Sequence, residues 1–210
     1  MGDKSFLNDQ LDLRLIEGYR CIKMKVGAIE IEQELGILQK IRNEKPNIQI
    51  RVDANGGYNA ETALVNMAHM EKFNIHSIEQ PCATDDIDAL AKVSREGIIP
   101  IALDESLIGV YEKKQRDILL DRIKPDFIVL KPSLIGGFKS CEDWISRAKI
   151  RGIKWWITSA LEGNEGLTGI AQWASSIPDL EGFQGFGTGS LYSNNTPPKT
   201  VVIDGDIWML

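Results

Sequence analysis

The chain is poor in the features that would tie it to a membrane, to nucleic acid or to an oxidising compartment. No apolar run reaches the roughly 18 residues that a membrane-spanning helix needs, and no segment resembles a signal peptide. Three cysteines without C-x-x-C spacing indicate reduced thiols in a cytoplasmic protein. A formal net charge of -6 and the lack of a basic run argue against nucleic acid as a partner.

Histidine is scarce, and the glycine motifs that cradle phosphates are absent. The two histidines, His69 and His76, fall in a predicted helix and at the start of a predicted strand. Neither a G-x-G-x-x-G nor a Walker sequence occurs, so a nucleotide-binding loop of these kinds is not expected. We therefore expect acid–base chemistry, if the chain performs any, to use groups other than imidazole.

What the sequence does contain is a regular alternation of short apolar runs and longer segments of helical period. This alternation predicts a parallel sheet with right-handed crossovers. The predicted strands are 21–26, 48–54, 77–80, 100–104, 127–131, 155–159 and 182–186. The predicted helices are 29–42, 60–72, 86–95, 111–120, 138–151 and 165–175, with Asn59 and Asp85 as two expected N-caps. Trp155 and Trp156 are adjacent on a strand, so we expect them to face opposite sides.

One polar residue or glycine marks the C-terminal end of each predicted strand. These residues are Lys25, Asp53, Glu79, Asp104, Lys131, Ser159 and Gly187, which lie 28, 26, 25, 27, 28 and 28 positions apart. A βα unit that repeats in this way, with each strand end delivering one group to the same rim, is the layout of a (β/α)8 barrel. We predict an α/β fold of the TIM-barrel type over 1–193, incomplete because seven of the eight strands are visible.

The two ends of the chain are assigned by the same pattern. Met1–Asp3 are expected to be the last residues of the missing first strand, and 5–18 the first helix. Residues 194–210 are expected to form two extended pieces around a turn at Gly205-Asp206. The apolar end at 208–210 is a reason to expect association, so an oligomer is left open.

Three of the strand-end residues are acids on consecutive strands. Asp53 lies in RVDANGG, Glu79 in SIEQP and Asp104 in ALDES. Carboxylates brought together at one rim repel one another unless a cation lies between them. Oxygen ligands favour Mg²⁺, with Mn²⁺ as the alternative. Each acid alone could be solvated or cap the next helix, but three in succession favour a metal site.

Lysines flank these acids. Lys25 and Lys131 end strands that lie opposite each other in an eight-stranded barrel, so they would face a substrate from two sides. Such a pair suits the removal of a proton next to a carboxylate, while a metal stabilises the resulting charge. Lys23 shares a strand face with Lys25 and would lower the pKa of that neighbour. The alternative for Lys23 is a structural ion pair with an acid inside the barrel.

The segments KMK, DAN, EQP, DES and KPSLIGG occur in an order and spacing that resembles the barrel domain of the enolase superfamily, muconate-lactonizing subgroup. The resemblance covers about 18 to 193. That superfamily uses a Lys or His base with one or two Mg²⁺ that stabilise an ene-diolate. The resemblance implies that the three acids are metal ligands, Lys25 is the base and Lys131 is the second catalytic lysine. Asn55 would lie beside the metal site.

Longer segments, GYRCIKMKVGAI, RVDANGGYN, WWITSALE and GFGTGSLYSNN, resemble the o-succinylbenzoate synthase family of menaquinone biosynthesis. This resemblance implies dehydration of a small cyclohexadiene carboxylate to o-succinylbenzoate. Lys25 would remove the proton and then protonate the departing hydroxyl, and Lys131 would stay charged over the anion. Substrate contacts are implied at Ser159, Asn164 and the backbone near Gly187. The residues on either side of Asn164 depart from the family pattern. Gly163 and Glu165 stand where a serine and a small apolar residue are usual.

Related activities on the same scaffold are the alternatives. N-succinylamino acid racemisation, dipeptide epimerisation and, less well supported, muconate cycloisomerisation would use the same lysines. Dipeptide epimerases resemble one another in an Asp-x-Asp where this chain has Gly185-Phe186-Gly187, which disfavours that activity. The alternative outside enzymes is an inactive fragment or a metal-binding pseudoenzyme, because the capping domain of the superfamily, to which 194–210 would normally return, is not evident.

Overall fold

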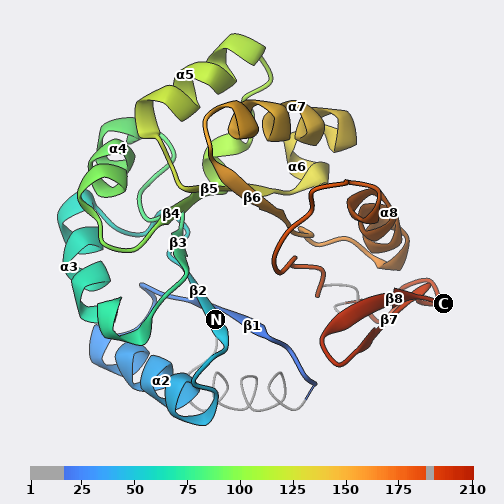
Figure 1. The fold of residues 1–210 in the computed structure, drawn as a ribbon, viewed down its shortest axis with the longest axis horizontal. Helices are drawn as coiled ribbons and strands as arrows, with labels where there is room; N and C mark the ends of the chain where they lie inside the picture. Colours follow the sequence, from blue (N-terminus) through green and yellow to red (C-terminus); the bar gives the residue numbers. More distant parts are fainter. Residues whose placement is uncertain (1–16, 188–191) are drawn as a thin grey trace.

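The computed structural model describes residues 17–187 and 192–210, and its main unit is a curled sheet of six parallel strands inside a ring of helices (Figure 1). The strands follow one another in space as in the sequence: β1 (Cys21–Lys25), β2 (Gln49–Asp53), β3 (Ser77–Glu79), β4 (Ile101–Leu103), β5 (Phe127–Leu130) and β6 (Lys154–Ile157). Each neighbouring pair is parallel. The predicted fold, an incomplete barrel of the TIM type, is confirmed.

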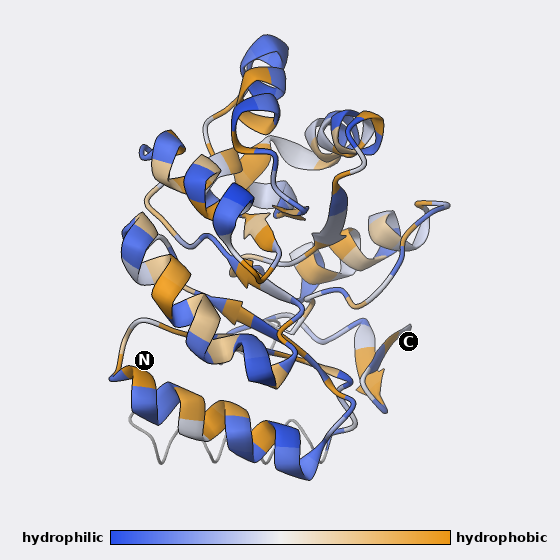
Figure 2. Ribbon diagram, turned by 60° about the vertical axis from the view of Figure 1, so that its left-hand side comes forward, coloured by the Kyte–Doolittle hydropathy of each residue, from blue (hydrophilic) through white to orange (hydrophobic). Residues whose placement is uncertain are grey.

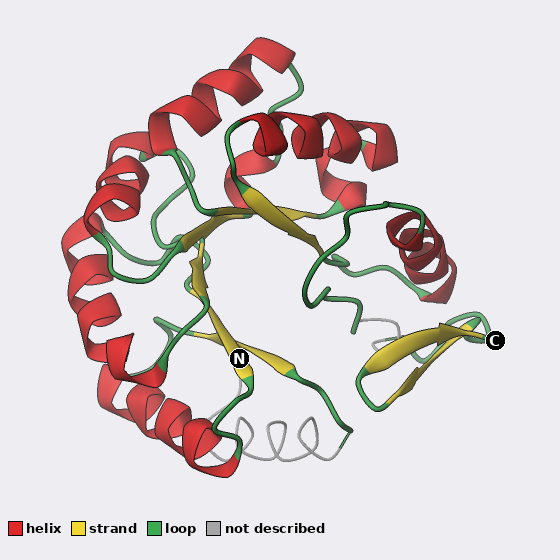
Figure 3. Cartoon of the chain, viewed as in Figure 1, coloured by secondary structure: helices red, strands yellow, loops and turns green. Residues whose placement is uncertain are grey.

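Helices connect the strands and cover the outer face of the sheet (Figure 3). They are α2 (Ile31–Glu44), α3 (Ala60–Met70), α4 (Ile87–Glu96), α5 (Lys113–Ile123), α6 (Pro132–Ile135), α7 (Gly137–Ile150) and α8 (Asn164–Ser175), with two 3₁₀ turns, η1 (Glu71–Phe73) and η2 (Glu105–Leu107). Asn59 caps α3 by accepting from the Thr62 N–H, as predicted. At α4 the cap is Asp86, which accepts from the Ala89 N–H, so the prediction of Asp85 was wrong by one residue.

Strand alternation separates the apolar side chains into two groups. The larger group lies between the sheet and the helices, whose ribbons are banded in orange and blue because one face of each packs inward (Figure 2). The smaller group consists of Ala102, Val129 and Trp156, with Phe127 packed against it. Trp155 packs on the larger group and Trp156 belongs to the smaller, which confirms that the two tryptophans face opposite sides.

The seventh predicted strand, 182–186, is wrong. Only Gly185 pairs there, through a bridge to Thr158. Its N–H donates to the Ile157 carbonyl at 2.9 Å, and its carbonyl accepts from the Ser159 N–H at 3.0 Å. Glycine weakens strand pairing, and Gly182 holds a positive φ of 69°, which extended backbone does not allow.

The last residues form an antiparallel hairpin of β7 (Thr200–Ile203) and β8 (Asp206–Met209). Its turn is Asp204-Gly205, where φ is 51° and 75°, so the prediction of Gly205-Asp206 was displaced by one residue. Two left-handed residues in a two-residue turn match the twist of a hairpin. The hairpin lies between α8 and the start of β1, where Asp206 pairs with Arg20 (Figure 1). The predictions for Met1–Asp3 and for the helix over 5–18 fall on residues that are outside the described part or at its margin.

Candidate active site

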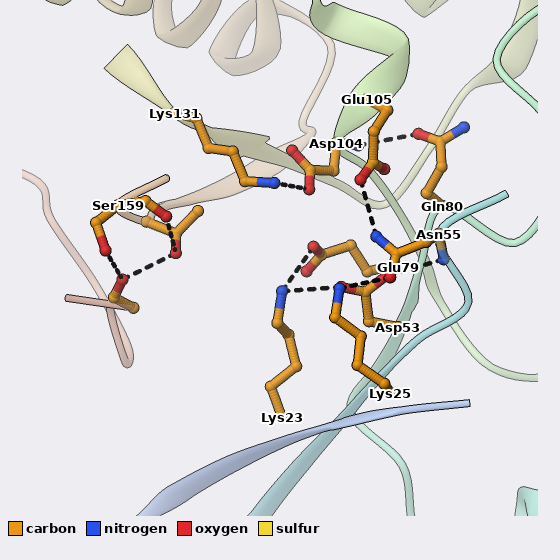
Figure 4. A network of polar contacts seen from close by, with 12 residues as sticks. Lys23, Lys25, Asp53, Asn55, Glu79, Gln80, Asp104, Glu105, Lys131 and Ser159 are labelled. Atoms are coloured by element: carbon orange, nitrogen blue, oxygen red, sulfur yellow. Dashed lines mark hydrogen bonds and ion pairs between the residues drawn. The ribbon is translucent and has the colours of Figure 1, made fainter. Parts of the chain in front are cut away.

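Three buried carboxylates meet at the C-terminal ends of neighbouring strands (Figure 4). Asp53 ends β2, Glu79 ends β3, and Asp104 follows Leu103 at the end of β4. Asp53 and Glu79 are direct partners in the parallel register, so the pairing itself places one beside the other. The three residues are 0%, 0% and 1% exposed, which takes their charges out of water.

Lysines approach these acids from two sides (Figure 4). Lys23 Nζ lies 2.9 Å from Asp53 Oδ2 and 2.8 Å from Glu79 Oε1, and Lys25 Nζ lies 2.6 Å from Asp53 Oδ2. Lys131, which follows β5, donates to Asp104 from the other side. Lys23 therefore makes the ion pair with interior acids that the sequence left as its alternative role.

The same surroundings shift the pKa values of these groups in opposite directions. Burial raises the pKa of Asp53, but Lys23 and Lys25 outweigh it and hold that pKa below its usual value. At Glu79 burial dominates, repulsion from Asp53 and Asp104 adds to it, and the pKa is raised to about 8 despite the attraction of Lys23. Burial lowers the pKa of Lys23, but attraction to Glu79 and Asp53 outweighs burial and leaves it above the usual range.

The chemistry of this donor set fits a divalent cation. Carboxylate oxygens are hard ligands, and Glu79 Oε2 is buried without a hydrogen-bond partner. Asp53 Oδ2 accepts from the amino groups of Lys23 and Lys25 at once. Over 17–187 and 192–210, no three acid, thiol or imidazole side chains are arranged around one point as ligands, and the carboxylates face lysines instead. A cation bound here would therefore compete with the lysines for the same oxygens.

Asn55 lies beside the acids. Its N–H donates to Asp53 Oδ1 at 3.0 Å, its Oδ1 accepts from Lys25 Nζ at 2.5 Å, and its Nδ2 donates to Glu105 Oε1 at 2.9 Å. Sequence reasoning missed Glu105 and also Gln80. The available signal was their position, because each directly follows a strand-end acid.

The other three predicted substrate contacts do not join this group. Ser159 is buried and donates to the Gly185 carbonyl at 3.2 Å. Asn164 begins α8, and its Nδ2 donates to the Thr196 carbonyl at 2.5 Å. Gly187 is exposed, and it lines with Asn164 a cavity of about 500 Å³ between α8 and the hairpin.

Neither histidine is near the acids. His69 is exposed on α3. His76 precedes β3 at the opposite end of the sheet, where its ring lies 4.7 Å from that of Phe127. Burial, together with the charges of Arg51 and Lys154, lowers the pKa of His76 to about 4.

Fold and rim together define a class of protein. Parallel α/β barrels carry their active sites at the C-terminal ends of the strands. In this chain, successive strand ends carry three acids flanked by lysines. The chain belongs to the enolase C-terminal domain-like family, whose model matches residues 7–209. The family prediction made from the sequence is thereby confirmed. No helix in the described residues is long and apolar enough to cross a membrane.

The chain is similar to individual members of this family over most of its length. The chain is 43% identical to an o-succinylbenzoate synthase of Desulfotalea psychrophila, over 99% of the chain and 56% of that protein. It is 30% identical to the L-Ala-D/L-Glu epimerase of Bacillus subtilis, over 80% of the chain and 46% of that protein. The crystal structure of MenC from D. psychrophila matches with a TM-score of 0.87 at 43% identity, over 99% of the chain and 57% of that structure. The chain spans about half the length of these relatives.

Proposed function

We propose that the chain carries the catalytic barrel of an o-succinylbenzoate synthase-type lyase. The observation that carries the proposal is the convergence of Asp53, Glu79 and Asp104 between Lys25 and Lys131 at one rim. The reaction removes a proton next to a carboxylate and expels a hydroxyl from the neighbouring carbon, which forms an aromatic ring. The substrate is a small carboxylate, and the expected compartment is the cytoplasm, in keeping with three free cysteines.

The three acids are the proposed ligands of Mg²⁺, with Mn²⁺ as the alternative. When bound, the ion supplies Lewis-acid stabilisation of negative charge on the substrate carboxylate. Asp53 and Glu79 are held side by side by the register of β2 and β3, and Asp104 directly follows β4, which pairs with β3. Rigid strands hold such a group more accurately than loops do.

Lys25 is the proposed base. Its side chain is 44% exposed, so the amine is open to a substrate above the rim, and hydrogen bonds to Asp53 and Asn55 hold it there. A neutral Lys25 accepts the proton from the carbon next to the carboxylate. The same ammonium then returns that proton to the departing hydroxyl, which leaves as water.

Lys131 is the proposed electrostatic partner. Its side chain is 15% exposed and pairs with Asp104 on the opposite side from Lys25. A fixed positive charge at that place stabilises the anion that forms when the proton leaves. The site needs a single base under this assignment, because the proton and the hydroxyl leave from the same face.

The 43% identity with an o-succinylbenzoate synthase supports this choice among activities on the scaffold. Racemisation and epimerisation need an acid–base lysine on each face, and Lys25 and Lys131 would satisfy that need. Gly185-Phe186-Gly187 offers no side-chain carboxylate for the amino group of a dipeptide, which disfavours an epimerase.

The test is formation of o-succinylbenzoate from the cyclohexadiene substrate, measured with Mg²⁺ and with EDTA. We expect metal-dependent turnover that falls about 10²- to 10⁴-fold in Lys25→Ala, the usual contribution of a general base. Lys92→Ala is the matched control, because Lys92 pairs with Glu61 on the surface and should leave the rate unchanged. A folded chain that binds metal without turning this substrate over, or a Lys25→Ala variant with the wild-type rate, would overturn the proposal. Racemisation of an N-succinylamino acid in place of dehydration would identify the alternative.

A further inference from the structure

Gln80 connects three consecutive strand ends through its backbone. It directly follows Glu79 and is 0% exposed. Its N–H donates to the Ala102 carbonyl of β4 at 2.8 Å, and its own carbonyl accepts from the Gly56 N–H, beyond β2, at 2.7 Å. The residue therefore lies at the junction of the strands that carry the three acids.

The side chain of Gln80 adds four more hydrogen bonds. Oε1 accepts from the Asp104 N–H at 3.2 Å (Figure 4). It also accepts from the Ser106 N–H at 3.1 Å. Nε2 donates to the Cys82 carbonyl at 2.9 Å and to Ser106 Oγ at 2.8 Å. A primary amide has two donor hydrogens and two acceptor lone pairs, so its full capacity is used. The donors around Oε1 and the acceptors around Nε2 also fix which end of the amide is which.

The backbone conformation of Gln80 is one that glycine would adopt more easily. Its φ is 40°, in the left-handed region that is unfavourable for a residue with a Cβ. Such a conformation persists only where the surrounding contacts determine it. A glycine here would relieve the backbone but would lose all four side-chain bonds.

Asp104 depends on the hydrogen bonds of the Gln80 amide more than the other two acids do. Asp53 and Glu79 end strands that pair with each other, whereas Asp104 lies past the end of β4 and directly precedes the turn η2. Asp104 makes no side-chain cap bond to that turn, and its carboxylate pairs with Lys131 at the end of β5 instead. The amide of Gln80 holds the Asp104 N–H and both polar groups of Ser106 to the end of β3.

We propose that Gln80 is a positioning residue that sets the spacing of the Glu79 and Asp104 carboxylates for a divalent cation. The inference rests on the metal site of the proposed function. It goes further by assigning the geometry of that site to an uncharged residue that touches neither the cation nor the substrate. Residues that orient ligands in this way typically change metal affinity by about 10- to 100-fold when they are replaced.

The test compares Gln80→Met with Gln184→Met. Methionine keeps the length of glutamine and removes every side-chain hydrogen bond. Gln184 is a matched control, because its Oε1 accepts from the Ile157 N–H at 2.8 Å and its Nε2 donates to the Glu181 and Gly182 carbonyls at 2.9 Å and 3.2 Å. It thus fastens a loop to β6 in the same manner, on a strand that carries none of the three acids. Mn²⁺ binding is measured by calorimetry, and unfolding in urea with EDTA is measured in parallel.

We expect Gln80→Met to weaken Mn²⁺ binding about 10- to 100-fold and Gln184→Met to change it less than about twofold, even where both variants lose stability. Wild-type affinity in Gln80→Met, or equal weakening in both variants, would overturn the inference. A wild-type chain that binds no Mn²⁺ would instead overturn the metal site of the proposed function. If Gln80→Met does not fold, Ser106→Ala takes its place, because it removes one partner of the amide. About threefold weaker binding is then expected, and unchanged binding contradicts the inference.

Discussion

The two ends of the sheet interior are built from the same strands and hold their residues together by different forces. At the C-terminal rim, Asp53 and Glu79 are buried among lysines, and their positions follow from ion pairs and strand register. At the opposite end, the ring of His76 lies 4.7 Å from Phe127, which lies 5.5 Å from Trp156. We call this second group of rings the aromatic floor.

Arg51 shows how closely the two kinds of environment approach each other. It lies on β2 two residues before Asp53, is 6% exposed, and places its guanidinium 3.9 Å from the centre of the Trp156 ring. A planar, weakly hydrated cation can stack on an aromatic face, so this charge is tolerated among rings. A carboxylate in the same place would be repelled by the electron-rich face. The floor therefore stabilises the fold by packing, while the rim holds charges that another cation can compete for.

The largest expected effect is a loss of unfolding free energy when one ring of the aromatic floor is removed. Trp156→Ala removes a side chain that is 3% exposed and leaves a cavity between Ala102 and Val129, so we expect a loss of about 3–5 kcal/mol in unfolding free energy. Urea denaturation measures it. Trp208→Ala is the control, since Trp208 is 58% exposed on β8 and should cost less than about 1 kcal/mol. Equal losses in the two variants would contradict the assignment of the floor.

A smaller change, in the free energy of metal binding, is expected at the C-terminal rim. Glu79→Gln keeps the shape of the side chain and removes its ability to ionise, so we expect Mn²⁺ affinity to fall by at least about tenfold. Because burial raises the pKa of Glu79 to about 8, we expect the unfolding free energy without metal at pH 7 to stay within about 1 kcal/mol of wild type. Calorimetric titration and urea denaturation measure the two quantities. Glu61→Gln, on an exposed pair with Lys92, should change neither. If Glu79→Gln bound Mn²⁺ as tightly as the wild type, Glu79 would not be a ligand.

The third expected effect is a dependence of stability on pH that originates at the aromatic floor. Because the pKa of His76 is lowered to about 4 from 6.5, the unfolded chain takes up this proton before the folded chain does. Stability should therefore be complete above about pH 6.5 and fall toward pH 4. We expect a loss of about 1–2 kcal/mol from this group, less than the full linkage, because the ring is half-buried and water screens its charge. Urea denaturation at pH 4.5 and 7 measures the change, and His76→Phe should show a smaller one than wild type.

The control for this effect is His69→Phe, because His69 is exposed on α3 and lies away from the floor. It should retain the wild-type dependence on pH. Identical pH dependence in His76→Phe and the wild type would show that the half-buried imidazole of His76 does not contribute.

Much of the rim could be predicted because its residues mark strand ends. Asp53, Glu79 and Asp104 recur at the spacing of one βα unit, and parallel pairing brings such positions together without further information. Lys25 and Lys131 follow from the same repeat. Ser159 obeys the spacing too, but its hydroxyl bonds to the Gly185 carbonyl, and a repeat in the sequence cannot show which partner a side chain selects.

What the sequence by itself determined is the order of strands and helices, the face on which each residue lies, and the rim to which the acids belong. These properties follow from local periodicity and from the repeat, which are present in the chain before it folds. The tertiary structure decided what depends on contacts between distant segments. It paired Lys23 with two acids, reduced 182–186 to a single bridge and folded Gln80 onto the turn after Asp104. Hydrogen bonds between residues more than twenty positions apart are set by packing, and no local pattern encodes them.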